Sequence, residues 1–196
     1  MSFVLASQSP SRLALLKQIG YVPGHVAPQD VDESEFPKEL PKDYLWRVTR
    51  MKVDSALKAF PDSIILGADT IVVTGRRIFQ RPQTKEEASK MLTHFSGRRV
   101  KVVSSVCVAR GETVKQKTIA TVIQIKRFSK LELDCYLQLK DWSHFSGGLA
   151  IDEIGGAFIK AINGSHSNVM GLPLYETKNL LESFGVYPDW MKKENS

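Results

Sequence analysis

The sequence is poor in cysteine and in long apolar runs. Cys107 and Cys135, 28 positions apart, are its two cysteines, and this spacing predicts neither a disulfide framework nor a zinc site. The longest apolar run, 63–73, is interrupted by Asp69 and is far shorter than the roughly 20 residues that span a bilayer. The first residues lack the basic segment and the long apolar run of a signal peptide. These absences predict a cytoplasmic protein with no membrane partner.

Basic residues are in excess, but they are not concentrated in one segment of the chain. The chain has 27 Lys and Arg against 21 Asp and Glu, a net charge of +6. The basic residues come singly or in pairs, whereas nucleic-acid-binding proteins usually gather them in a run or a helical stripe. We therefore expect a mildly basic solvated surface or a small phosphate-bearing substrate, and no nucleic acid partner. A nucleic-acid-binding module is an alternative that rests on charge alone.

The remaining composition is that of a globular protein, with 42% hydrophobic residues and a mean hydropathy of −0.17. A chain of 196 residues predicts one domain, or two lobes that share a core. Short apolar strands and amphipathic helices interleave, which predicts an α/β fold with a mixed sheet. Helices are expected over 9–19, 42–59, 84–95, 129–139 and 174–184, and strands over 3–6, 64–73, 100–109, 118–126 and 157–162.

The segment 6–12 lies where the first strand is expected to turn into a helix. Ser9 is a suitable N-cap and Pro10 suits the first turn. Free backbone N–H groups at a helix start, together with serine hydroxyls and the cation of Arg12, form a potential anion site. A plain Ser-Pro cap that binds no ligand is the alternative.

A single carboxylate interrupts the apolar strand 64–73. Burying Asp69 would cost several kcal/mol unless it is paired, hydrogen-bonded or bound to a metal, so a functional carboxylate is favoured over one satisfied by turn amides. Glu33, in the acidic loop 28–35, is a candidate companion, because two carboxylates and phosphate oxygens together hold a divalent cation. A purely solvated loop is the alternative for Glu33.

Two further cations are candidate phosphate ligands. Lys52 falls on the second expected helix, and Arg81 precedes Pro82. Taken alone, each is more often a solvated surface charge, and this is the alternative. The four histidines show no metal-ligand spacing, and the sequence contains neither a P-loop nor a Gly-x-Ser-x-Gly motif.

Together these motifs resemble the Maf family over nearly the whole chain. The resemblance is carried by Leu5–Pro10, Val31–Glu33, Lys52, Leu66–Thr70, Glu87–Gly97, Gly155–Ser165 and Val169–Leu174. It implies an elongated mixed β-sheet flanked by helices around a central cleft, similar to inosine-triphosphate pyrophosphatases, with residues 1–196 forming a single domain of two lobes. It also implies a possible homodimer, and hydrolysis of nucleoside triphosphates to monophosphates and pyrophosphate in a house-cleaning role, with Mg²⁺ or Mn²⁺ as cofactor.

The resemblance also implies roles for individual residues. Asp69 matches the family's catalytic base, Glu33 and Lys52 match other catalytic positions, and Glu33 and Asp69 would hold the metal. Thr70 and a strand over 148–152 would face the base, and Thr70 resembles the family branch that prefers dTTP and UTP, whereas the branch acting on 7-methyl-GTP has Gln there. The expected substrate-binding residues are Ser7, Ser9, Ser11, Arg12, Thr70, Arg81 and Asp152.

Some positions depart from the family pattern. Ser11 replaces an Arg, Ala14 a Glu, Arg81 a Lys and Asp152 a Gln. An ionised Asp152 only accepts hydrogen bonds, which favours an amino group such as that of CTP. The expected substrates are therefore dTTP and UTP, with CTP or modified pyrimidine nucleotides in addition. Arg81 keeps the charge of the Lys, so it is expected to be tolerated. The departures at Ser11, Ala14 and Asp152 motivate the alternative of a non-catalytic or weakly active nucleotide-binding regulator of cell division.

Overall fold

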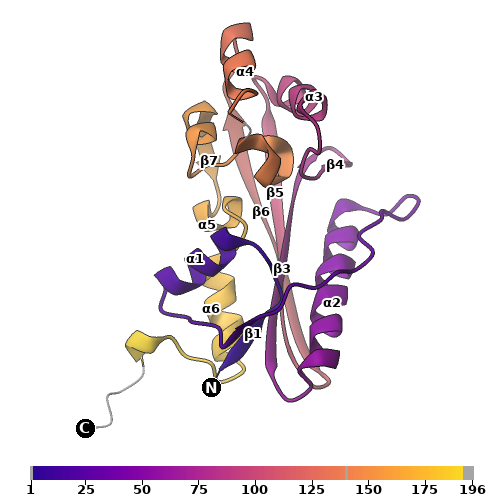
Figure 1. The fold of residues 1–196 in the computed structure, drawn as a ribbon, viewed down its shortest axis with the longest axis vertical. Helices are drawn as coiled ribbons and strands as arrows, with labels where there is room; N and C mark the ends of the chain where they lie inside the picture. The colour runs from indigo at the N-terminus through magenta and orange to yellow at the C-terminus, as the bar shows by residue number, and fades with distance from the viewer. Residues whose placement is uncertain (1, 140, 192–196) are drawn as a thin grey trace. The chain divides into compact units, whose positions relative to one another are not determined.

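The computed structural model describes residues 2–139 and 141–191 (Figure 1). The chain groups into two compact units, which are described separately. Unit 1 comprises 1–69, 104–119 and 171–196, and unit 2 comprises 70–103 and 120–170. That these units make up one domain stays a prediction.

The described residues form a seven-stranded mixed sheet, which confirms the predicted α/β class. The strand order is β2-β1-β3-β5-β6-β7, and β4 pairs with β3 outside this path. Strand β1 runs parallel to both β2 and β3, whereas β4 is antiparallel to β3 and β7 is antiparallel to β6. The strands are β1 (Phe3–Leu5), β2 (His25–Val26), β3 (Ile64–Thr74), β4 (Arg77–Phe79), β5 (Arg99–Arg110), β6 (Thr113–Ile125) and β7 (Ile159–Asn163).

Most helices begin where the sequence offers a cap. The side chains of Ser9, Thr84 and Ser129 each accept a backbone N–H at a helix start, which satisfies one of the free donors there. The helices are α1 (Pro10–Gln18), α2 (Pro41–Ala59), α3 (Lys85–Phe95), α4 (Lys130–Tyr136), α5 (His166–Val169) and α6 (Leu174–Glu182), with 3₁₀ turns η1 (Asp141–His144), η2 (Ser146–Gly148), η3 (Ile154–Phe158) and η4 (Asp189–Met191). None of the helices in the described part of the chain is long and apolar enough to cross a membrane.

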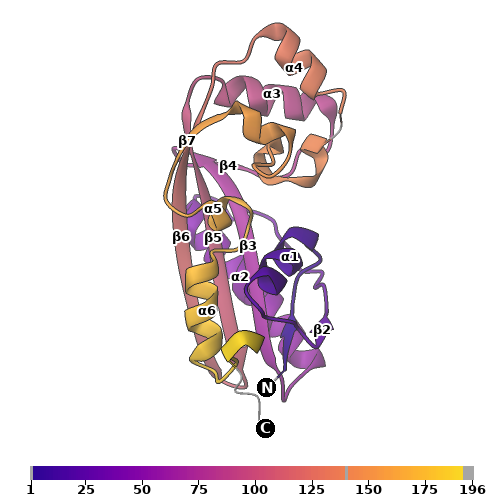
Figure 2. The ribbon, with the colours of Figure 1, turned by 90° about the vertical axis from the view of Figure 1, so that its left-hand side faces the viewer.

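In unit 1 the sheet is covered on both faces. Helices α1 and α6 lie on one face and α2 on the other (Figure 2). Small and β-branched side chains let α2 pack closely: Val53 and Ala56 belong to one buried cluster with β1, β3 and β5 residues such as Val4 and Ile65. Burial of such side chains contributes roughly 1.5–3 kcal/mol each. This packing fixes α2 against β3, the strand that carries Asp69.

Unit 2 has a more aromatic core. The ring centroids of Phe79 and Phe95 lie 4.8 Å apart in an edge-to-face arrangement, a geometry that stabilises a core beyond simple area burial. A second cluster gathers Tyr136, Trp142 and Phe158 beneath α3. These rings anchor α3, α4 and the 3₁₀ turns within the unit.

The structure corrects several expected boundaries. The helix expected over 129–139 ends at Tyr136, and the strand expected over 157–162 is Ile159–Asn163, because η3 occupies the residues before it. The strand expected over 148–152 is wrong: Gly147 and Gly148 both have φ of +74°, which breaks an extended strand, and the residues after them form turns.

Candidate active centre

Asp69 lies in β3 at a point where α2 comes very close to the strand. A Cβ at Gly67 would lie 2.4 Å from Val53 Cγ2, so only glycine allows this approach. The close packing brings Lys52, which precedes Val53 on α2, within reach of the Asp69 carboxylate. The Asp69 side chain is 15% exposed, which fits the prediction of a carboxylate largely withdrawn from water.

Lys52 joins the two predicted carboxylates. Its Nζ lies 2.8 Å from Asp69 Oδ2 and 2.8 Å from Glu33 Oε1. The Lys52 side chain is 13% exposed and that of Glu33 is 43% exposed. The structure thus brings together three of the residues predicted from the sequence, from a loop, a helix and a strand, and Glu33 lies at the more solvated end of the group.

Arg12 approaches Asp69 from the opposite helix, α1, and is held by three groups. Its Nε donates to the carbonyl oxygen of Gly171 at 2.9 Å, and its Nη1 donates to Ser7 Oγ at 3.0 Å. Its Nη2 lies 3.6 Å from Asp69 Oδ1. Arg12 is only 8% exposed, so its guanidinium has a fixed direction, with one edge toward the carboxylate.

The serine hydroxyls at the start of α1 already have protein partners. Ser7 Oγ accepts from the Ser9 backbone N–H as well as from Arg12, and Ser9 Oγ accepts from the Arg12 backbone N–H. Ser11 is partly buried in the first turn of α1. The Ser-Pro cap is therefore confirmed, and the anion-binding role of these serines stays a prediction.

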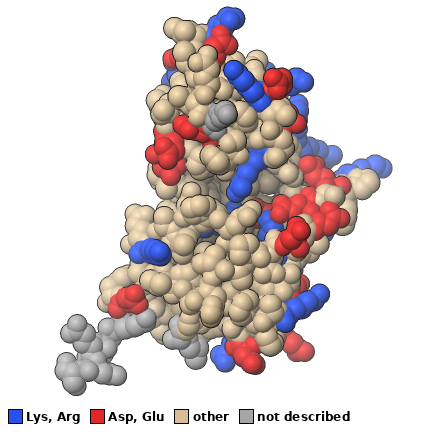
Figure 3. Space-filling view, viewed as in Figure 1, with Lys and Arg blue, Asp and Glu red and all other residues tan. Residues whose placement is uncertain are grey.

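The loop that carries Glu33 is tied to α2 by Arg47, a residue that the sequence analysis did not identify. Arg47 donates from Nε and Nη2 to the Glu39 carboxylate at 2.8 and 2.7 Å, and from Nη2 to the Ser34 carbonyl at 2.9 Å. Its guanidinium lies 3.8 Å from the ring centroid of Phe36. Figure 3 shows acidic side chains gathered at the right of the view, where the loop before α2 lies in Figure 1. No sequence signal marks Arg47, because its partners are separated from it by the turn into α2.

Replacing Arg47 by Ala is expected to loosen this loop without unfolding the unit. The substitution removes a bidentate charge-assisted pair, each such bond contributing about 1.5–3 kcal/mol, so amide hydrogen exchange at Phe36 and Glu39 should accelerate at least about tenfold. Arg50→Ala is the matched control, since Arg50 pairs with Asp54 on the exposed face of the same helix. Equal exchange rates in the two variants would show that Arg47 does not hold the loop.

Tyr44 is a buried neighbour of the Asp69 and Glu33 carboxylates. Burial raises the pKa of its hydroxyl, and the negative charges of Asp69 and Glu33 raise that pKa further. Tyr44 therefore stays protonated at physiological pH and keeps an O–H donor on the buried side of α2. The helix expected over 42–59 includes Tyr44, but the sequence gives no sign that this residue lies close to Asp69 and Glu33.

Three predicted site residues belong to unit 2. The Thr70 carbonyl accepts a hydrogen bond from Ser146 Oγ at 3.0 Å, which joins β3 to η2. Arg81 is exposed after β4, and Asp152 is exposed in the turn before η3. Their roles in substrate binding stay predictions.

The donor set around Lys52 fits a cation that is shared with substrate. The described residues contain no group of three or more His, Cys, Asp and Glu side chains placed to hold a metal. Mg²⁺ usually keeps several waters and is bound by one or two carboxylates together with substrate phosphates. Glu33 and Asp69, both within 2.8 Å of one ammonium group, supply such a pair of carboxylates.

Comparison with known proteins gives concordant matches over nearly the full length. A model of the family described as Maf-like protein matches residues 2–184. The chain is 44% identical over 188 residues to the dTTP/UTP pyrophosphatase of Ruegeria sp. (strain TM1040), covering 96% of both chains. It is 42% identical over 184 residues to the nucleoside triphosphate pyrophosphatase of Anaplasma phagocytophilum (strain HZ), covering 93% of this chain and 95% of that protein.

A solved structure has a similar fold. The Staphylococcus aureus Ham1 protein aligns with a TM-score of 0.55 at 15% sequence identity, covering 94% of this chain and all of that one. At this identity the likeness shows the fold alone. It agrees with the mixed sheet and flanking helices expected from the sequence.

Proposed function

The chain belongs to the Maf family, and on that premise we propose that it is a nucleoside triphosphate pyrophosphatase acting on dTTP and UTP. The names of both relatives support this reaction, and the name of the Ruegeria protein supports these substrates. The observation that carries the proposal is the placement of Asp69, with Lys52 at 2.8 Å on one side and Arg12 at 3.6 Å on the other. The two cations hold this carboxylate in one place on the strand, where it can accept a proton from water.

Asp69 would act as the general base. Its carboxylate takes a proton from a water molecule, whose oxygen forms a bond to the α-phosphorus of the nucleotide. The bond between the α-phosphorus and its bridging oxygen breaks, and the electron pair leaves with pyrophosphate. Lys52 and Arg12 offset the negative charge on the phosphates, and we propose that Arg81 binds them as well. The Gly171 carbonyl and Ser7 keep the Arg12 guanidinium in one orientation during this step.

Glu33 and Asp69 would hold the divalent cation. A bound Mg²⁺ or Mn²⁺ would supply Lewis-acid stabilisation of charge developing on the phosphate oxygens. Lys52 contacts both carboxylates and reduces their mutual repulsion. The carboxylate oxygens, hard anionic ligands, are suited to either ion.

Chelation is expected to abolish turnover, and Mg²⁺ or Mn²⁺ is expected to restore it. The neutral amide in Glu33→Gln is a weaker ligand than the carboxylate. In Glu33→Gln the metal concentration that gives half the maximal rate should therefore rise. At saturating metal, the rate of this variant should differ less from that of the unsubstituted protein than it does at low metal. The readout is pyrophosphate release across a metal titration, with Asp32→Asn as the exposed control in the same loop. Undiminished hydrolysis in EDTA would remove the cation from this proposal.

A nucleotide panel separates the enzyme from a nucleotide-binding regulator. Pyrophosphate release from dTTP and UTP, at a rate proportional to protein concentration, is the result expected of the enzyme. Saturable nucleotide binding without pyrophosphate release would instead support the regulator suggested by Ser11, Ala14 and Asp152. Asp69, Glu33 and Lys52 are all present, which favours catalysis.

Asp152 is proposed to broaden the choice of base. An ionised carboxylate facing the carbonyl edge of uracil or thymine leaves two acceptors opposed, which costs about 1–3 kcal/mol, whereas the amino group of cytosine can donate to it. Asp152→Gln is therefore expected to raise the UTP/CTP ratio of kcat/KM about tenfold. Glu153→Gln, at the neighbouring exposed carboxylate, is the control. An unchanged ratio, or a ranking led by a purine, would exclude this role for Asp152.

A further inference from the structure

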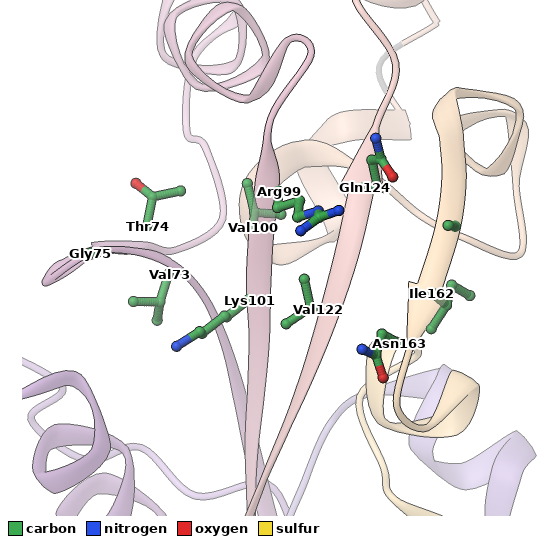
Figure 4. Close-up of a pocket in the computed structure, with 11 residues that line it drawn as sticks. Val73, Thr74, Gly75, Arg99, Val100, Lys101, Val122, Gln124, Ile162 and Asn163 are labelled. Atoms are coloured by element: carbon green, nitrogen blue, oxygen red, sulfur yellow. The ribbon is translucent and has the colours of Figure 1, made fainter.

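The sheet of unit 2 has a cavity of about 550 Å³ that contains none of the candidate active-centre residues. Its walls come from β3, β5, β6 and β7, and Figure 4 shows the labelled side chains on these strands. The volume lies within the roughly 300–1,000 Å³ of typical small-molecule sites. The lining residues are Val73, Thr74, Gly75, Arg99, Val100, Lys101, Val122, Gln124, Ala161, Ile162 and Asn163.

Two cations on β5 line the cavity without any acidic side chain beside them. Arg99 and Lys101 are two positions apart, so they lie on the same face of the strand, about 7 Å apart along it. Both are exposed, and neither makes an ion pair or side-chain hydrogen bond within residues 2–139 and 141–191. Figure 4 shows the Arg99 side chain extending toward Gln124 and the Lys101 side chain extending to the other side of β5. The two cations therefore offer positive charge at two places along the cavity.

The charge of the surrounding unit has the same sign. Unit 2 contains 13 Lys and Arg against 7 Asp and Glu, whereas unit 1 contains 14 of each. The whole net charge of +6 therefore resides in unit 2. Such a field raises the local concentration of anions, and Arg99 and Lys101 place two of these charges at one cavity.

Neutral donors complete the lining. The β6–β7 register pairs Gln124 with Ala161 and Val122 with Asn163. Two carboxamides thus sit on neighbouring strands, and the small Ala161 side chain leaves room beside Gln124. Amide N–H groups and a guanidinium fork are the donors that phosphate oxygens take. No lining residue is aromatic, so the cavity lacks the stacking platform that proteins use for exposed bases.

We propose that this cavity binds a small molecule through a diphosphate or triphosphate group. Arg99 and Lys101 would each pair with phosphate oxygens, and Gln124 and Asn163 would donate to the remaining ones. The absence of aromatic side chains directs recognition to the phosphates rather than to a base. The proposal is independent of the activity assigned to Asp69, because the two groups of residues share no member.

The test is a titration of the full chain with methylenediphosphonate, a non-hydrolysable diphosphate, in metal-free buffer. Amide chemical shifts of Thr74, Gly75, Lys101, Gln124 and Asn163 should move in a saturable way. In the double variant Arg99→Gln, Lys101→Gln the affinity at these amides should fall about tenfold or more, because the two lost charge-assisted contacts together are worth at least that factor. The spectrum of the variant also reports whether it is folded.

The matched control is Lys115→Gln, Lys117→Gln, which removes two exposed cations at the same spacing on β6 in unit 1. It should leave the affinity at the cavity amides unchanged. An equal loss in both double variants would reduce the binding to general electrostatic attraction and overturn the proposal. So would an absence of shifts at these amides, or a single-stranded oligonucleotide that perturbs them while the diphosphonate does not.

Discussion

Asp69→Asn is expected to lower kcat by about 10²–10⁴-fold, the usual cost of losing a general base. The amide has nearly the same shape as the carboxylate and can still accept a hydrogen bond from Lys52, so the fold of unit 1 should persist. It cannot take a proton from water at neutral pH. The measurement is kcat for pyrophosphate release from dTTP or UTP at saturating metal, with circular dichroism to verify the fold.

The control for this variant is Asp54→Asn, the same chemical change at a carboxylate that pairs with Arg50 on the exposed face of α2. Exposed pairs of this kind contribute at most about 1 kcal/mol, so kcat should be unaffected. If Asp69→Asn kept more than about a tenth of the normal kcat, Asp69 would not be the base, and the proton would have to go to another group.

Much of the fold could be predicted because its signals are local. The Ser-Pro cap before α1, the helix expected from residue 84 and the apolar strand on both sides of Asp69 each depend on neighbouring residues in the sequence. The structure has α1, α3 and β3 at these places. Strands β2 and β4 were missed, because two or three residues are too few to show a period. The strand over 148–152 was implied by the family resemblance alone, and the positive φ angles of Gly147 and Gly148 do not allow an extended strand to begin there.

The candidate site also has residues that could be predicted from local sequence and contacts that could not. Asp69 stands out in the sequence because a carboxylate in an apolar strand needs a partner, and the structure supplies Lys52 and Arg12. The partners of Arg12 and Arg47 were not predictable: Gly171 lies 159 positions from Arg12, and the Ser34 carbonyl that Arg47 binds carries no side-chain signal. Contacts to backbone oxygens depend on tertiary packing, so composition and spacing do not reveal them.

Arg12→Ala is expected to lower both the stability of the protein and its turnover. The guanidinium joins α1 to the turn at Gly171 and to Asp69 in β3, all within unit 1. Its removal takes away the Arg12 donor to the buried Gly171 carbonyl and the more distant of the two cations beside Asp69, which keeps Lys52 at 2.8 Å. Losing hydrogen bonds from a charged group of this kind costs about 1.5–3 kcal/mol each. The urea midpoint should therefore fall clearly. Lys17→Ala, at an exposed cation on the same helix, should change the free energy of unfolding by no more than about 0.5 kcal/mol.

Arg12→Lys distinguishes the structural part of this effect from the catalytic part. An ammonium group keeps the positive charge near Asp69 but cannot bond Gly171, Ser7 and the carboxylate at once, because it lacks the planar fork of a guanidinium. Turnover is measured at a temperature where every variant is folded. Relative to Arg12→Ala, the Arg12→Lys variant should regain more of the lost turnover than of the lost urea midpoint. If the free energy of unfolding of Arg12→Ala lay within about 1 kcal/mol of that of Lys17→Ala, the contacts of Arg12 would not stabilise unit 1. A loss of turnover in that variant would then come from the missing charge beside Asp69 alone.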